Sequence, residues 1–154
     1  ALHPWTAAEY TELAADPDSD DKFFFMVRAN ADDGLLGWVI LDEIQLKNRR
    51  AELGIALPVA SDRGQGYGVD TLNTILSFAF NELGLHKVTL DVNANNQAAL
   101  RAYAAVGFVR EGINREAVYQ DGQWLDLYQF GILAKEWWTV SRGTIPDENT
   151  TADN

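Results

Sequence analysis

The stretch of sequence that decides the fold is Arg63-Gly64-Gln65-Gly66-Tyr67-Gly68. It lies between a segment of strand character, Arg50 to Leu57, and a periodic helical segment that begins near Val69. Three alternate glycines permit positive φ angles and let a ligand approach the backbone closely. The helix start presents free N–H groups and the positive end of a dipole, and Arg63 adds a planar fork of donors. This pattern predicts a loop that binds phosphate.

Two familiar phosphate loops do not fit this stretch. A P-loop requires Lys-Ser or Lys-Thr after its last glycine, but Gly68 is followed by Val69-Asp70. The dinucleotide-binding fingerprint requires two residues between its second and third glycines, and here there is one. Taken alone, the loop is also compatible with a glycine-rich turn that only joins a strand to a helix.

The elements around the loop indicate a mixed sheet. The periodicity of the apolar residues predicts strands and helices. The turn residues predict hairpins between strands, and glycines predict the ends of helices. The expected strands are Lys22 to Ala29, Leu35 to Leu41, Arg50 to Leu57, Lys87 to Val92, Phe108 to Tyr119 and Gln123 to Leu133. The expected helices are Thr6 to Ala15, Val69 to Leu83 and Asn96 to Val106, the last ended by Gly107 as a left-handed cap. Strands in series followed by a strand-helix-strand unit predict an α/β (α+β) fold.

Composition bounds the class of protein. The 154 residues, 47% of them apolar, suit one domain, which we place at residues 1–140 with a polar tail at 141–154. The formal net charge of -11 makes nucleic acid a poor partner and favours cationic ligands, although solubility alone also explains it. No cysteine and only two histidines occur, which excludes thiolate catalysis and leads us to expect no metal site.

The chain shows no membrane or secretion signal in its sequence. No run of about 18 apolar residues occurs, as a spanning helix would need. The segment from Ala1 to Tyr10 lacks the basic and apolar regions of a secretory signal. We therefore expect a cytoplasmic protein without a membrane partner.

Two motifs in this order resemble the GNAT superfamily of N-acetyltransferases. Arg63 to Gly68 is similar to its pyrophosphate loop, Gln/Arg-x-x-Gly-x-Gly/Ala. Asn96 to Tyr103, followed by Gly107-Phe108, is similar to its second motif, Asn-x-x-Ala-x-x-x-Tyr with a closing Gly-Phe. Later residues resemble the branch of ribosomal-protein N-terminal and spermidine-type acetyltransferases: Arg110-Glu111-Gly112, Arg115-Glu116, Tyr119, Asp121-Gly122, Trp124, Asp126 and Glu136-Trp137. The resemblance covers Trp5 to Trp137.

This resemblance implies a particular sheet. GNAT domains have a mixed, mostly antiparallel sheet flanked by helices, and it splays between two central parallel strands. Here those strands are Arg50 to Leu57 and Lys87 to Val92. The family also has a strand and a helix before the segment that matches Trp5 to Ala15. We find neither in this sequence and expect both to be absent from the chain.

The resemblance also implies acetyl-CoA as cosubstrate and assigns residues to it. Backbone groups of Ile55, Ala56 and Leu57 would hydrogen-bond the pantetheine arm. Asn96 would contact the cofactor near the second helix. The pyrophosphate would be held by Arg63 and by the amides of Gly64, Gln65, Gly66, Tyr67 and Gly68.

Two residues are candidates for the chemistry. Tyr103 lies two helical turns after Asn96 on the same face, and its phenol would donate a proton to the departing thiolate of CoA. Without the motif, a core aromatic is the simpler reading of Tyr103. Glu52 would accept the proton of the attacking amine, although a salt bridge to Arg49 or Arg50, or proton loss through water, is the alternative. Weaker candidates on the acceptor side are Glu116, Tyr119 and Asp126.

The predicted function is an N-acetyltransferase that moves an acetyl group from acetyl-CoA directly to a primary amine. The acceptor stays open among a protein N-terminus, a polyamine and another small amine. No covalent enzyme intermediate is needed, in keeping with the absence of cysteine. The alternative is a CoA-binding regulatory or degenerate GNAT domain without turnover. By the same resemblance, we expect the late hairpin to support a homodimer.

Overall fold

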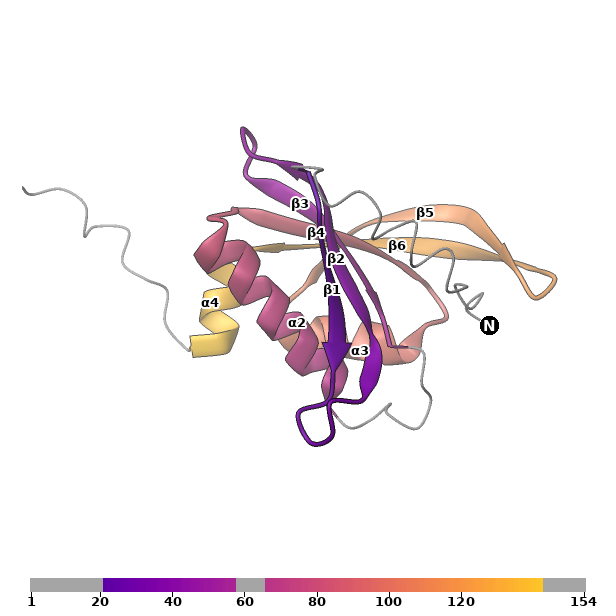
Figure 1. Ribbon diagram of the computed structural model, residues 1–154. Helices are drawn as coiled ribbons and strands as arrows, with labels where there is room; N and C mark the ends of the chain where they lie inside the picture. The colour runs from indigo at the N-terminus through magenta and orange to yellow at the C-terminus, as the bar shows by residue number, and fades with distance from the viewer. Residues whose placement is uncertain (1–20, 58–65, 143–154) are drawn as a thin grey trace, which may run out of the picture.

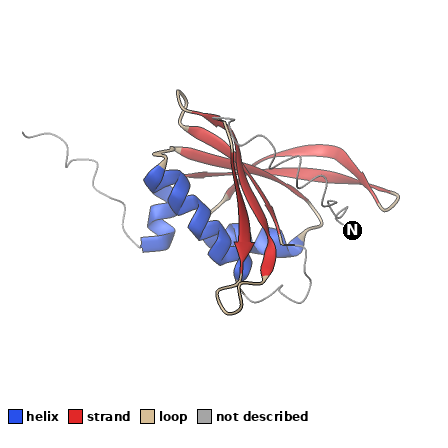
Figure 2. Ribbon diagram, viewed as in Figure 1, coloured by secondary structure: helices blue, strands red, loops and turns tan. Residues whose placement is uncertain are grey.

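A computed structural model describes residues 21–57 and 66–142 of the chain. Six strands form one sheet in the order β1-β2-β3-β4-β6-β5, with helices packed beside it (Figures 1 and 2). The strands are β1 (Phe23–Arg28), β2 (Leu35–Gln45), β3 (Arg50–Ala56), β4 (Lys87–Asn93), β5 (Val109–Gln120) and β6 (Gln123–Leu133). The helices are α2 (Tyr67–Ser77), α3 (Gln97–Val106) and α4 (Ala134–Arg142), and the π-helical turn η2 (Phe78–Glu82) extends α2.

The centre of the sheet is a short parallel contact. Strands β3 and β4 pair through Arg50↔Lys87, Ala51↔Val88 and Glu52↔Thr89 only, although both strands continue beyond these pairs. The other pairings of the described sheet are antiparallel. The sheet therefore opens between β3 and β4 after Glu52, which confirms the predicted mixed, mostly antiparallel GNAT-like sheet.

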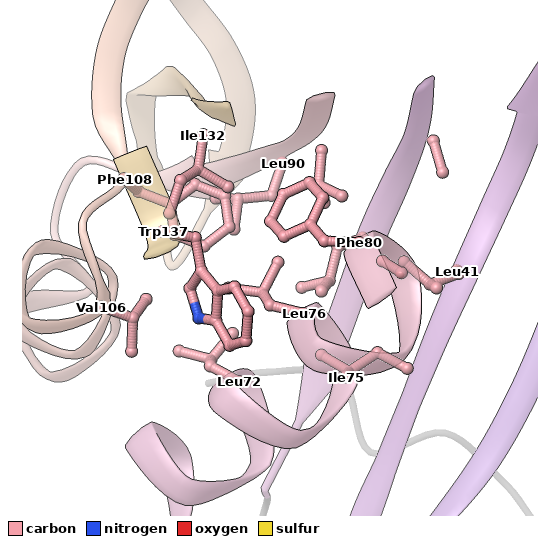
Figure 3. Close-up of a cluster of buried hydrophobic side chains, with 14 of the residues drawn as sticks. Leu41, Leu72, Ile75, Leu76, Phe80, Leu90, Val106, Phe108, Ile132 and Trp137 are labelled. Carbon is pink, nitrogen blue, oxygen red and sulfur yellow. The ribbon is translucent and has the colours of Figure 1, made fainter. Parts of the chain in front are cut away.

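One hydrophobic core joins the helices to one face of the sheet. Alternate strand residues such as Leu41, Leu53 and Leu90 pack with residues of α2, α3 and α4 in this core (Figure 3). Trp137 of α4 is 4% exposed, and its indole N–H donates a hydrogen bond to Asn73 Oδ1 of α2 at 3.1 Å. The three helices therefore lie together on one face.

Two turn predictions are confirmed by the backbone. Asp121 and Gly122 both have positive φ, 52° and 75°, as the tight hairpin between β5 and β6 requires. Gly107 ends α3 with φ 107°, in the left-handed region. The long β5–β6 hairpin extends away from the rest of the sheet (Figure 1).

The structure also corrects several boundaries. Helix α2 begins at Tyr67, two residues before the expected start, because Gly66 with φ 82° already turns the chain into the helix. Strand β2 continues four residues past Leu41, through an irregular register with β3 between Asp42 and Gln45. The expected single helix ends in η2, where the Leu83 N–H bonds to the Phe78 carbonyl at 3.0 Å.

Helix α4 was not predicted from the sequence. No Ser, Thr, Asp or Asn precedes it, and its one local start signal is Glu136, whose carboxylate accepts a hydrogen bond from the Leu133 N–H at 3.3 Å. Docking of Trp137 into the core supplies the tertiary contact that a helix this short needs. It ends at Arg142 and so enters the expected polar tail by two residues. The expected helix from Thr6 to Ala15, the loop residues Arg63, Gly64 and Gln65, and the rest of the tail lie outside the described residues.

Candidate active site

A cavity of about 470 Å³ lies where the sheet opens. Its walls come from the end of β3, the start of α2 and the length of α3. The lining residues are Ile55, Ala56, Leu57, Gly66, Gly68, Val69, Leu72, Asn96, Ala98, Ala99, Arg101, Ala102, Tyr103 and Ala105. The structure thus brings together seven of the predicted cofactor residues from three separate segments.

The β3 wall offers open backbone groups. After Glu52 the strand pairs with no other described strand on its β4 side, because the parallel pairing with β4 ends at Glu52↔Thr89. On its other side, Ile55 and Ala56 stay paired with Val39 and Trp38 of β2. Unpaired strand groups are strong hydrogen-bonding sites, so this edge is suited to binding an extended amide-containing ligand.

The α2 wall presents the N-terminus of a helix. By helix geometry the N–H groups of Tyr67, Gly68 and Val69 have no acceptor within the helix, whereas the Asp70 N–H bonds to the Gly66 carbonyl at 3.0 Å. Apart from Gly66 and its neighbours in the chain, no heavy atom of the described residues lies within 4 Å of the place where a Cβ on Gly66 would stand. Tyr67 and Asp70 line a neighbouring cavity and are not among the lining residues of this one.

The α3 wall begins with a capped end. The Asn96 side-chain oxygen accepts a hydrogen bond from the Ala99 N–H at 3.2 Å, which caps the helix. The sequence interpretation gave Asn96 only a cofactor contact and missed this cap, although Asn before a helical run is a known signal. It also missed the stripe formed by Ala98, Arg101, Ala102 and Ala105, whose spacing places them on one helix face.

Tyr103 closes the inner end of the cavity. It is 6% exposed, and its ring contacts those of Phe108 and Phe130 at centroid distances of 5.6 and 6.3 Å. Burial raises the pKa of Tyr103 to about 12. The phenol therefore keeps its proton at neutral pH and can act as a hydrogen-bond donor.

Glu52 does not line the cavity. Its neighbours Ala51 and Leu53 are buried in the core, so the side chain of Glu52 projects from the opposite face of the sheet. Partial burial raises the pKa of Glu52 above its ordinary value of 4.5, and the negative charges of Asp91, Glu43 and Asp42 raise it further. The nearby Arg50 lowers this pKa in part.

The weaker candidates lie on the extended hairpin. The Glu116 N–H donates to Asp126 Oδ1 at 2.9 Å, which holds an irregular turn of β5 where Glu116 has φ 50°. Tyr119 is 63% exposed, and its ring lies tilted against the ring of Trp124 with the two centroids 4.9 Å apart. Neither of the two cavities described in this section is lined by these residues.

A second cavity of about 660 Å³ lies between β1, β2 and α2. Its walls are largely apolar, with Val27, Val39, Ile75 and Phe78 among them. In the described ranges no group of three or more His, Cys, Asp or Glu side chains is arranged to hold a metal ion. No helix of these ranges is long and apolar enough to cross a membrane.

We predict that Glu52→Gln raises the melting temperature at pH 8 and that this gain disappears below about pH 4. The folded-state pKa of Glu52 is raised, so ionisation favours the unfolded chain as pH climbs through 4.5 and beyond. Glutamine removes that penalty at high pH and changes little where the carboxyl is protonated in both states. Thermal unfolding across pH measures this, with the exposed Glu82→Gln as control. An unchanged or lower melting temperature at pH 8 would contradict it.

Comparisons with known proteins address the family. Residues 2–109 match the model of the acetyltransferase (GNAT) domain. The putative ribosomal N-acetyltransferase YdaF of Bacillus subtilis is 28% identical over 69% of this chain and 57% of its own length. A spermidine N(1)-acetyltransferase of Vibrio cholerae is 32% identical over 70% of this chain and 62% of its own length. The chain thus spans less than two thirds of these curated relatives.

The fold leads to the same group of proteins. The crystal structure of spermidine N-acetyltransferase from Vibrio cholerae in complex with CoA and spermine matches with a TM-score of 0.77 at 30% identity. The match covers 87% of this chain and 79% of that one. With its two motifs, its opened sheet and these relatives, the chain belongs to the GNAT acetyltransferase family, which confirms the predicted family and the predicted class of enzyme, an N-acetyltransferase.

Proposed function

We propose that this chain transfers the acetyl group of acetyl-CoA directly to a primary amine, and that the amine belongs to a polyamine. The observation that carries the proposal is the cavity at the opened sheet, which is bounded by the start of α2 and by Tyr103. The relatives named above support it, since one is a spermidine acetyltransferase and one structural neighbour holds CoA and spermine.

The lining of the cavity suits a CoA thioester. The N-terminus of α2, with Gly66 in a left-handed conformation, favours a pyrophosphate. The free edge of β3 at Ile55 to Leu57 suits the amides of a pantetheine arm. Apolar walls at Val69, Leu72 and the alanines of α3 exclude water from the inner end.

Tyr103 and Glu52 divide the proton transfers in this proposal. When bound, acetyl-CoA supplies an activated thioester: a C–N bond to the amine forms and the C–S bond breaks. Tyr103 donates a hydrogen bond, and then a proton, toward the departing sulfur. Glu52, on the opposite face, accepts the proton that the amine loses, and N–H groups near Ile55 stabilise negative charge on the carbonyl oxygen.

The acceptor assignment depends on the face that carries Glu52. Asp42 is the β2 partner of Glu52, and Asp91 lies two residues beyond its β4 partner, so all three carboxylates project on the same face of neighbouring strands. Their mutual repulsion contributes to the raised pKa of Glu52. Such a surface attracts a ligand with several ammonium groups more strongly than one with a single charge.

Acetyl-CoA is expected to raise the melting temperature of the protein. At about 100 times its dissociation constant it adds about 2.7 kcal/mol to the unfolding free energy. Gly66→Val should abolish the shift, because a β-branched residue fits poorly at φ 82° and fills the space beside the helix start. Gly122→Val is the matched control: its φ is 75°, it also has no atom near its Cβ position, and it lies in the distant hairpin turn. A shift retained in Gly66→Val would place the cofactor elsewhere.

Tyr103→Phe is expected to lower kcat by about 100-fold while leaving the KM for acetyl-CoA nearly unchanged. Phenylalanine keeps the contacts with Phe108 and Phe130 but removes the donor. Steady-state thiol release measures both constants, and Tyr128→Phe controls for loss of a phenol at a residue outside the cavity lining. An unchanged kcat would mean that Tyr103 only packs in the hydrophobic core and donates no proton in the reaction.

A panel of amines tests both turnover and acceptor. We expect thiol release with spermidine or spermine at a kcat/KM at least about tenfold above that with a peptide N-terminus or a monoamine. Acetyl-CoA binding without thiol release for any amine would favour a regulatory domain without turnover.

With the best acceptor, Glu52→Gln should lower kcat/KM most strongly near neutral pH. An unaltered pH profile of kcat/KM would mean that Glu52 is not the base.

A further inference from the structure

Arg101 has an unusual place in the cavity. Among the described lining residues it is the one charged side chain. It is exposed, and it forms no ion pair or hydrogen bond with another described side chain. In a protein of net charge -11, an unpaired cation at the rim of an otherwise uncharged cavity is suited to binding an anionic group of a ligand.

The exposure of its lining residues places Arg101 at the outer end of the cavity. Arg101 and Tyr103 both line it, from the same helix. Tyr103 is buried at 6% exposure, whereas Arg101 is exposed. A ligand whose reacting end reaches Tyr103 therefore has its other end near Arg101.

The same end of the cavity lies against the start of α2. A Cβ built on Gly68 would stand 3.8 Å from Cβ of Ala102, the residue after Arg101. The N–H groups of the first turn of α2 are thus close to the backbone of α3 at this point. They are suited to the pyrophosphate, which leaves the guanidinium of Arg101 for a second anionic group.

We propose that Arg101 binds the ribose 3′-phosphate of CoA and sets the preference for CoA over its 3′-dephospho form. This inference rests on the proposed use of acetyl-CoA. The 3′-phosphate is the one remaining anionic group of the cosubstrate, and it lies at the nucleotide end, away from the thioester. A guanidinium pairs with a phosphate through two parallel N–H···O hydrogen bonds, which a lysine ammonium cannot reproduce.

The test compares acetyl-CoA with acetyl-3′-dephospho-CoA in the wild-type enzyme and in Arg101→Gln. For the wild type, the KM for the dephospho form should be about tenfold higher, and the difference should shrink at high salt. Arg101→Gln should raise the KM for acetyl-CoA to that level and leave the KM for the dephospho form and both kcat values nearly unchanged. Arg101→Lys should restore part of the preference.

Lys47→Gln is the matched control, because it removes one exposed positive charge in the β2–β3 turn, away from the cavity. It should leave the ratio of the two KM values unchanged. An equal rise in both KM values for Arg101→Gln would mean that Arg101 binds the pyrophosphate or acts only through long-range electrostatic attraction. Unchanged KM values with an unchanged ratio would mean that Arg101 does not contact the cosubstrate. Either result overturns the inference while the acetyl-CoA-dependent thermal shift still stands. Absence of that shift in the wild type would instead overturn the proposed function and this inference with it.

Discussion

The contact between β3 and β4 is the constraint on which the rest of this structure depends. Three residue pairs join the two strands, and they stand at the start of both. The two strands then separate because each stays paired with its neighbour on the other side. Strand β3 pairs with β2 and strand β4 pairs with β6, and both antiparallel pairings are long. Beyond Glu52, peptide groups that a continuous sheet would have satisfied face an open space, where leaving them without a partner costs free energy. A ligand with its own amides can supply those partners.

A sheet divided in this way must be held together elsewhere. The helices do this on one face, since α2 packs against α3 and both contact the core residues of each half. Helix α4 adds a connection, through Trp137 to Asn73 of α2 and through Val140, which lies within 3.1 Å of the Cβ position of Gly107. The opening can therefore stay wide at the cavity while the rest of the sheet remains a single packed body.

Much of this arrangement was predictable from the sequence, for identifiable physical reasons. Turn residues with special φ angles, such as Gly107 and Asp121-Gly122, determine local geometry by themselves, and the structure follows them. The predicted lining residues Ile55, Gly66, Asn96 and Tyr103 meet because their motifs end strands or begin helices at the same edge. In contrast, α4 depends on tertiary burial of one tryptophan, and no local pattern contains that information.

The site was less predictable where it depends on which face a side chain occupies. Arg101 belongs to a helical stripe of small residues, and only the packing of α3 beside the start of α2 shows that the stripe lines a cavity. Glu52 and Tyr103 were expected to act in one reaction, Glu52 on the amine and Tyr103 on the thiolate of CoA, and the structure places them on opposite faces of the sheet. The sequence alone could have predicted this separation. Glu52 alternates along β3 with the apolar residues Ala51 and Leu53, so its side chain must lie on the opposite face of the strand.

The division of charge between the two faces suits the proposed reaction. An anionic cosubstrate and a cationic acceptor cannot share one entrance without competing for its field. Here the helix-side cavity has a helix N-terminus, one guanidinium and no carboxylate among its described lining residues. Asp42, Glu52 and Asp91 lie on the other face, where partial burial and then the negative charges around it raise the pKa of Glu52. A net charge of -11 is therefore compatible with the proposed binding of acetyl-CoA, because the opened sheet separates the acidic surface from the cavity, and in this proposal the two reactants meet at the gap between β3 and β4.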